Sequence, residues 1–233
     1  MSRRPFIVAI DGPAGAGKST VSRILARRLG FALVDTGAIY RCVALQAARE
    51  GIPLDDDLRL GRLLERVHIG FRMVEGENHA ILEGKDVSAE IRTPEVSMGA
   101  SAGSSRPVVR QGLLDLQRRL ALEAPAGAIL EGRDIGTVVF PDADAKFFLT
   151  AEPEVRARRR WAELKAKGDP SSYEQVLEEQ RKRDRDDSQR AIAPLRPAAD
   201  ALVVDTSHLG LDEVVARLVA EVETRLAKAG AAR

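Results

Sequence analysis

The sequence predicts an α/β fold in which a five-stranded parallel sheet is flanked by helices on both faces. Short apolar runs alternate along the chain with longer amphipathic stretches, and this alternation is typical of buried parallel strands joined by crossover helices. The composition, with 44% apolar and 30% charged residues, is that of an ordinary globular chain. A length of 233 residues suffices for one substantial domain, or for one domain that carries an insertion.

The first elements predict a β-α-β unit. An apolar run at 6–10 precedes a helical pattern at 18–29 and a second apolar run at 32–34, after which Thr36 opens another helix. Three further apolar runs complete the predicted sheet, at 128–130, 146–149 and 201–204. Further helices are predicted at 107–123, 153–167 and 173–189.

Residues 55–103 do not fit this alternation and predict an inserted subdomain. A helix at 58–67 precedes two strands at 69–74 and 79–82, with tight turns expected between the strands and again at 84–86. The core domain then comprises residues 1–54 and 104–233.

The late part of the chain has two charged helices, which are joined by the turn-forming residues 168–172. Residues 227–233 are expected to form a frayed tail.

The charge balance excludes several classes of partner. Lys and Arg number 36 against 35 Asp and Glu, a net charge of +1, so no global field attracts nucleic acid or an anionic membrane.

The single cysteine, Cys42, excludes an intramolecular disulfide and fits a reducing compartment. The apolar run at 6–10 is too short for a signal-peptide core or a membrane span. We therefore expect a soluble cytoplasmic protein.

Residues 12–19 match the pattern G-x-x-x-x-G-K-[ST] and lie between a predicted strand and a predicted helix, as this motif requires. They predict a P-loop NTPase fold that binds ATP with Mg2+. Lys18 is expected to reach the β- and γ-phosphates, and the Ser19 hydroxyl is the expected magnesium ligand. The alternative is a glycine-rich turn with a surface lysine. The residues expected to contact ATP are Gly12, Pro13, Ala14, Gly15, Ala16, Gly17, Lys18, Ser19 and Thr20.

A phosphate-binding loop alone does not distinguish a kinase from a GTPase or a motor. No later sequence resembles the guanine-reading pattern of GTPases. Residues 35–41 and 131–137 each follow a predicted strand, so both segments are expected at the carboxyl edge of the sheet, where ligands bind. Arg41 and Arg133 can bind a second anion there, and Asp134 can accept from an exocyclic amine or orient Arg133. The alternatives are a solvated arginine and a local ion pair at a strand end.

The combined motifs resemble the bacterial cytidylate (CMP) kinases, a branch of the nucleoside monophosphate kinases. The resemblance runs from about Phe6 to Leu226 and includes the insertion, which marks the bacterial type. It rests on the phosphate-binding loop together with the segments 35–41 (DTGAIYR), 90–93 (EIRT), 132–141 (GRDIGTVVFP) and 190–194 (RAIAP).

The resemblance implies roles for individual side chains. By motif position, Ser101, Arg110 and Asp134 contact cytosine, and the insertion contributes to binding the monophosphate. The residues that hold the acceptor phosphate are Thr36, Arg41, Arg133 and Arg190, where many relatives have serine in place of Thr36. Arg183 and Asp187 contact the ribose. The spacing of 183, 187 and 190 places them on one helix face, although a solvated helix face is the alternative for such a charged stretch.

The implied reaction transfers the γ-phosphoryl group of ATP to CMP or dCMP. Lys18 and Arg133 are the expected catalytic cations. The resemblance also implies a mobile helical lid over about 153–190, whose arginines Arg156, Arg159 and Arg160 join these cations, and family members are commonly monomers. Asp11, Asp35 and Glu131 are equal candidates for supporting Mg2+. Two alternatives stay open: a kinase for another small acceptor such as a different nucleoside monophosphate, and a nucleotide-dependent switch or nucleic-acid-binding ATPase.

Overall fold

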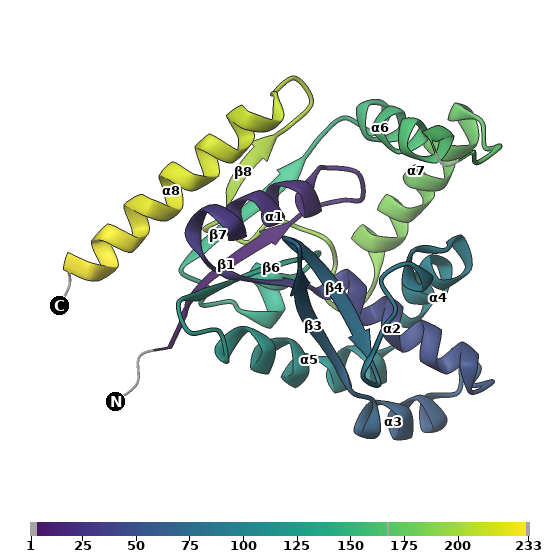
Figure 1. Cartoon of the computed structure of the whole chain (residues 1–233). Coiled ribbons are helices and arrows are strands. Elements are labelled where there is room, and N and C mark those ends of the chain that lie inside the picture. Colours follow the sequence, from purple (N-terminus) through teal and green to yellow (C-terminus); the bar gives the residue numbers. More distant parts are fainter. Residues whose placement is uncertain (1–3, 167, 232–233) are drawn as a thin grey trace.

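The computed structural model describes residues 4–166 and 168–231 (Figure 1). The five-stranded parallel sheet that the sequence predicts is present, and its strand order is β2-β6-β1-β7-β8. In chain order these strands are β1 (Phe6–Asp11), β2 (Ala32–Asp35), β6 (Gly127–Gly132), β7 (Ala145–Thr150) and β8 (Leu202–Asp205). The central strand β1 is buried along its whole length.

Helices cover both faces of this sheet because successive strand residues point to opposite sides. Ile7 and Ala9 of β1 share a core with α2 (Thr36–Arg49) and α5 (Pro107–Leu122). Val8 and Ile10 share the other core with α1 (Lys18–Leu29) and α8 (Leu211–Ala231). The carboxyl ends of β1, β2 and β6 therefore meet at one edge, where the polar segments that follow them gather.

The segment between α2 and α5 contains a small antiparallel sheet. Its elements are α3 (Asp57–Arg66), β3 (Ile69–Val74), β4 (Glu77–Leu82), β5 (Lys85–Asp86), the 3-10 helix η1 (Glu90–Arg92) and α4 (Pro94–Ser104). The turn expected at 84–86 was misplaced: it lies at Glu83 and Gly84, with φ of 49° and 76°, and residues 85–86 pair with β4. Apolar side chains of α3 and β4 join the same core as Ile7.

Two helices follow β7: α6 (Pro153–Ala166) and α7 (Tyr173–Gln189). The predicted end of the first one, Lys167, lies outside the described residues. Ser172 and Gln175 form a capping box that starts α7, since the Ser172 hydroxyl accepts from Gln175 N–H while the Gln175 side chain accepts from Ser172 N–H. Trp161 packs edge-on against Tyr173 and joins the two helices.

The expectation of a frayed tail from Ala227 was wrong for residues 227–231, because α8 continues to Ala231. Residues 232–233 lie outside the described part of the chain. Alanine and lysine are strong helix formers, and they extend the helix beyond Val222, which is still packed in the core. Among the described residues, no helix combines the length and apolar character needed to span a bilayer.

Candidate active site

The phosphate-binding loop joins β1 to α1 and depends on glycine at three positions. Gly12, Gly15 and Gly17 have φ of 146°, 77° and 86°, conformations that other residues rarely adopt. A Cβ atom on Gly12 would lie 1.9 Å from the carbonyl oxygen of Leu149 in β7. At Gly12 the loop therefore lies so close to β7 that a side chain would not fit between them.

Lys18 is buried at the start of α1, with 7% of its surface exposed. Its Nζ donates to the carbonyl oxygen of Pro13 at 2.8 Å, so the side chain folds back over the loop. Burial, and next the positive charge of Arg133, hold the pKa of Lys18 well below its usual range. A bound polyphosphate would supply the negative charge that this buried ammonium needs.

Ser19 lies beside a buried carboxylate at the end of β6. Its hydroxyl donates to Glu131 Oε2 at 2.8 Å. Burial, and next the charge of Asp35, raise the pKa of Glu131 to about 7. The two oxygens form a pair of hard ligands directly at the loop.

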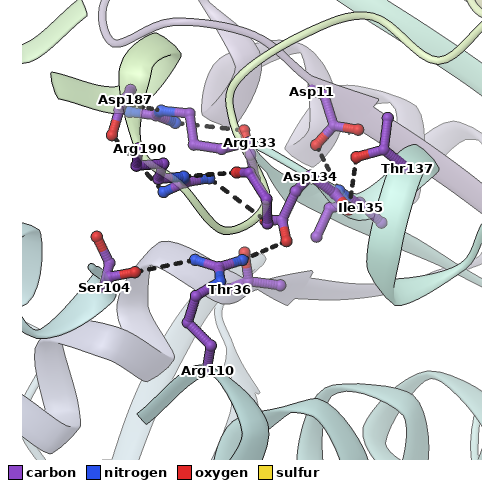
Figure 2. A network of polar contacts seen from close by, with 12 residues as sticks. Asp11, Thr36, Ser104, Arg110, Arg133, Asp134, Ile135, Thr137, Asp187 and Arg190 are labelled. Atoms are coloured by element: carbon purple, nitrogen blue, oxygen red, sulfur yellow. Dashed lines mark hydrogen bonds and ion pairs between the residues drawn. The ribbon is translucent and has the colours of Figure 1, made fainter. Parts of the chain in front are cut away.

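The other two candidate carboxylates have structural partners. Both oxygens of Asp11 accept backbone N–H groups, from Ile135 and Gly136 at 2.8 Å each (Figure 2). Asp35 caps α2 by accepting from Ala38 N–H at 2.8 Å, and its other oxygen accepts from Arg41 at 3.1 Å. Of the three carboxylates, Glu131 is therefore the one placed to support a metal at Ser19.

Positive side chains gather near Lys18 without enough acceptors to satisfy them. Burial lowers the pKa of Arg183 to about 10, and the charges of Arg133, Arg41 and Arg160 contribute to this shift. Among the described residues, the buried Nε atoms of Arg41 and Arg183 have no hydrogen-bond partner. Buried donors are nearly always satisfied in folded proteins. This cationic group is thus suited to bind an anion.

Asp134 connects this region to a second polar network, shown in Figure 2. Its Oδ2 accepts from Arg110 Nη2, while Arg110 Nη1 donates to the carbonyl oxygen of Ser104 at 3.1 Å. Arg133 Nε donates to Asp187 at 2.9 Å. Arg190 lies 3.9 Å from Asp134 and 3.8 Å from Asp187. Arg110, Arg133, Asp134, Asp187 and Arg190, which the sequence selects on separate segments, thus form one connected network.

Thr36 and Ser101, which are predicted to contact the acceptor nucleotide, have different surroundings. The Thr36 hydroxyl donates to the backbone carbonyl of Glu131 at 2.7 Å, so its proton already has an acceptor inside the protein. Ser101 lies in α4, and its hydroxyl makes no hydrogen bond within the described residues. The carbonyl oxygen of Ser104, one helical turn after Ser101, accepts a hydrogen bond from Arg110.

The three lid arginines have different surroundings. Arg156 is buried and donates to Ala14 of the phosphate-binding loop and to Asp184 of α7. Arg159 donates to Thr206 after β8, at 3.1 Å to the hydroxyl and 2.6 Å to the carbonyl. Arg160 is exposed, lies 3.2 Å from Glu163 and contributes to the lowered pKa of Arg183. Of the three, Arg160 is therefore the one whose positive charge lowers the pKa of a member of the cationic group, Arg183.

Sequence reasoning missed two side chains that support this site. The ring of Tyr40 lies under the Arg110 guanidinium, with 5.8 Å between the ring centroid and Cζ. Its position directly before Arg41, in the segment 35–41, was the available signal. Asp184 pairs with Arg156, but it is one of several carboxylates in a charged helix. No pattern in the sequence distinguishes it.

Comparisons with known proteins identify the family of this chain. The sequence model of the family described as Cytidylate kinase matches residues 8–224. The cytidylate kinase of Geobacter sulfurreducens is 51% identical over 223 residues, which cover 96% of this chain and 95% of that protein. The cytidylate kinase of Mycobacterium leprae is 50% identical over 220 residues, which cover 94% of this chain and 96% of that protein. Among solved structures, TT1252 from Thermus thermophilus has 25% sequence identity and a TM-score of 0.47. The match covers 96% of this chain and 99% of that chain. The family match and the identity to these relatives show that the chain belongs to the cytidylate kinase family.

Proposed function

We propose that this kinase transfers the γ-phosphoryl group of ATP to the 5′-phosphate of CMP or dCMP, releasing ADP and CDP or dCDP. The observation that carries the proposal is the cationic group of Lys18, Arg41, Arg133, Arg160 and Arg183, in which the buried Nε atoms of Arg41 and Arg183 lack acceptors among the described residues. It connects the phosphate-binding loop to the Asp134 network. ATP bound at the phosphate-binding loop and a monophosphate bound at the Asp134 network would both bring their phosphates to these cations.

In-line transfer at this site requires no general base. The attacking oxygen belongs to a phosphate that is already anionic, so catalysis depends on alignment and on neutralising charge. Lys18 would stabilise the β- and γ-phosphate oxygens. Arg133 and Arg41 would hold the acceptor phosphate in line, and Arg160 would approach the transferring group from α6.

Asp134 and Arg110 supply the chemistry that recognises cytosine. The base offers an N4 amine, which a carboxylate accepts, and N3 and O2 atoms, which a guanidinium or a hydroxyl can donate to. Arg110 is already fixed by Asp134, the Ser104 carbonyl and the Tyr40 ring. Ser101 supplies a further hydroxyl on α4, while Arg183 and Asp187 would contact the ribose.

The Ser19 hydroxyl and the Glu131 carboxylate fit a magnesium ion. Both are oxygen donors, the type that Mg2+ prefers, and Mg2+ in kinases keeps several waters and phosphate oxygens in addition to one or two protein ligands. A magnesium ion bound here would supply positive charge that offsets the negative charge developing during transfer. Ser19 would be a direct ligand, and Glu131 would orient the Ser19 hydroxyl.

Replacing Glu131 by glutamine should raise the Mg2+ concentration needed for half-maximal activity by about ten- to a hundredfold, as losses of outer-sphere partners do. Glutamine keeps the size and one hydrogen-bonding oxygen but removes the charge. Magnesium titrations at saturating ATP and CMP would measure the effect. Glu178→Gln, at an exposed carboxylate on α7 that pairs with Arg185, serves as the control. Equal magnesium requirements in the two variants would contradict the role given to Glu131.

A panel of AMP, CMP, dCMP, UMP and GMP, each supplied with ATP and Mg2+, tests the reaction itself. CDP and dCDP should be the leading products, because Asp134 accepts from the cytosine amine and faces a carbonyl oxygen in UMP. If another monophosphate leads the panel, the cytosine assignment is wrong. If none is phosphorylated, the kinase reaction proposed here is wrong.

The near-neutral net charge of the chain supports small nucleotides over nucleic acid as substrates. We also propose that the protein is a cytoplasmic monomer.

A further inference from the structure

Asp184 makes a two-point ion pair that joins the lid helices. From α7 it accepts Arg156 Nη2 at 2.7 Å and Nη1 at 3.2 Å. Arg156 lies in α6 and is 3% exposed, while the Asp184 side chain is 22% exposed. A bidentate guanidinium–carboxylate pair that is mostly shielded from water has a fixed geometry. Asp184 therefore determines where the Arg156 guanidinium lies.

The same guanidinium reaches the phosphate-binding loop. Arg156 Nη1 donates to the carbonyl oxygen of Ala14 at 3.1 Å, and Nε donates to the carbonyl oxygen of Ala151 after β7 at 2.8 Å. Four of its five N–H groups thus have protein acceptors in the described part of the chain. This side chain is placed to hold the loop rather than a phosphate. Figure 1 shows α6 and α7 side by side near the N-terminal end of α1, where the loop lies.

The peptide between Ala14 and Gly15 is the part of the loop that this contact fixes. Gly15 has φ of 77°, and glycine adopts positive and negative φ with similar ease, so a peptide flip costs little at this position. A flip would turn the Gly15 N–H away from the phosphates and point the Ala14 oxygen toward them. The hydrogen bond from Arg156 to Ala14 opposes that flip.

The tip of the loop borders both a cavity and the helices α6 and α7. The cavity of about 210 Å³ lies beside Pro13 and is lined by Pro13, Phe148, Thr150, Arg156, Asp184, Ser188 and Leu195. A Cβ on Gly15 would lie 2.9 Å from Gln180 Nε2 and 3.1 Å from Arg156 Cβ, so α6 and α7 contact the loop tip directly.

We propose that Asp184 is a positioning residue for ATP binding, which acts through Arg156 to keep the Ala14–Gly15 peptide oriented with its N–H toward the phosphates. This inference rests on the proposed function, because it takes ATP as the occupant of the loop. Asp184 itself touches no substrate. The opposite possibility is that Asp184 withholds Arg156 from the phosphates, in which case its removal would strengthen ATP binding.

The test compares Asp184→Asn with Asp186→Asn. Asp186 lies on the same helix, but its side chain is 61% exposed and its ion-pair partner at 3.8 Å, Lys182, is exposed as well. The Asp186 variant should therefore behave as the unmodified protein. Asp184→Asn removes the charge with little change of shape. It should raise the KM for ATP about tenfold, the usual effect of losing a charge-assisted hydrogen bond, and leave the KM for CMP unchanged. Asp184→Glu should recover part of the loss.

Binding of ATP alone, measured by titration calorimetry, provides a second readout that does not depend on turnover. Weaker ATP binding in Asp184→Asn than in Asp186→Asn supports the proposal. Equal binding in the two variants, tighter binding in Asp184→Asn, or equal rises in the KM for both substrates would each overturn it. If the unmodified protein binds ATP but does not phosphorylate CMP, the proposed reaction fails, while the comparison of ATP affinities still decides the role of Asp184.

Discussion

Replacing Lys18 by alanine should lower kcat by roughly a thousandfold, because this ammonium would stabilise the charge that develops on the transferring phosphoryl group. The folded protein should not lose stability to the same degree. Burial and Arg133 disfavour the charged form of Lys18 in the absence of a nucleotide. We therefore expect a melting temperature equal to or above that of the unmodified protein. Steady-state kinetics and thermal unfolding of the same preparation would measure both effects.

Lys182→Ala is the matched control for this experiment. Lys182 is an exposed lysine of α7 that lies 3.8 Å from Asp186. Exposed ion pairs of this kind contribute little to stability, so its variant should keep both activity and melting temperature. Similar losses of activity in the two variants would contradict the role of Lys18. A steep fall in melting temperature for Lys18→Ala would show that the lysine acts mainly in the fold.

The sheet was predictable because its strands are short apolar runs, and β1 and β6 are buried on both faces. The phosphate-binding loop was predictable for a different reason, since its function depends on consecutive residues. The positions of Arg133 and Asp134 followed from their place after a strand, because parallel strands of one sheet end at the same edge. In each case a local pattern carried the information.

The contacts that sequence reasoning could not predict depend on register and helix rotation. Glu131 lies beside Ser19 because β6 pairs with β1 in a register that matches Ile10 with Glu131. Nothing in the apolar runs determines that register. Asp184 and Asp186 look alike in the sequence, yet the rotation of α7 directs the first to Arg156 and leaves the second in water. The short strand β5 was missed because two residues show no alternation.

Replacing Arg133 by alanine should lower kcat by about a hundredfold or more, a loss typical of removing one charged group that stabilises a transition state. Its Nε is fixed by Asp187 at 2.9 Å, and in the described part of the chain no protein acceptor occupies Nη2. The guanidinium is thus held by Asp187 through Nε and by the Gly132 carbonyl through Nη1 at 3.3 Å, which leaves Nη2 to bind phosphate. It also lies close enough to Lys18 and Arg183 to lower the pKa of both.

Arg133→Lys and Arg158→Ala make this prediction specific. Lysine restores the charge but cannot hold Asp187 and a phosphate through two parallel edges, so it should recover only part of the activity. Arg158 is exposed on α6, two residues from both Arg156 and Arg160, and its alanine variant should keep nearly full activity. Equal losses in Arg133→Ala and Arg158→Ala would remove Arg133 from the site. Full recovery by lysine would mean that Arg133 acts through its charge alone, and that its bond to Asp187 does not align the acceptor phosphate.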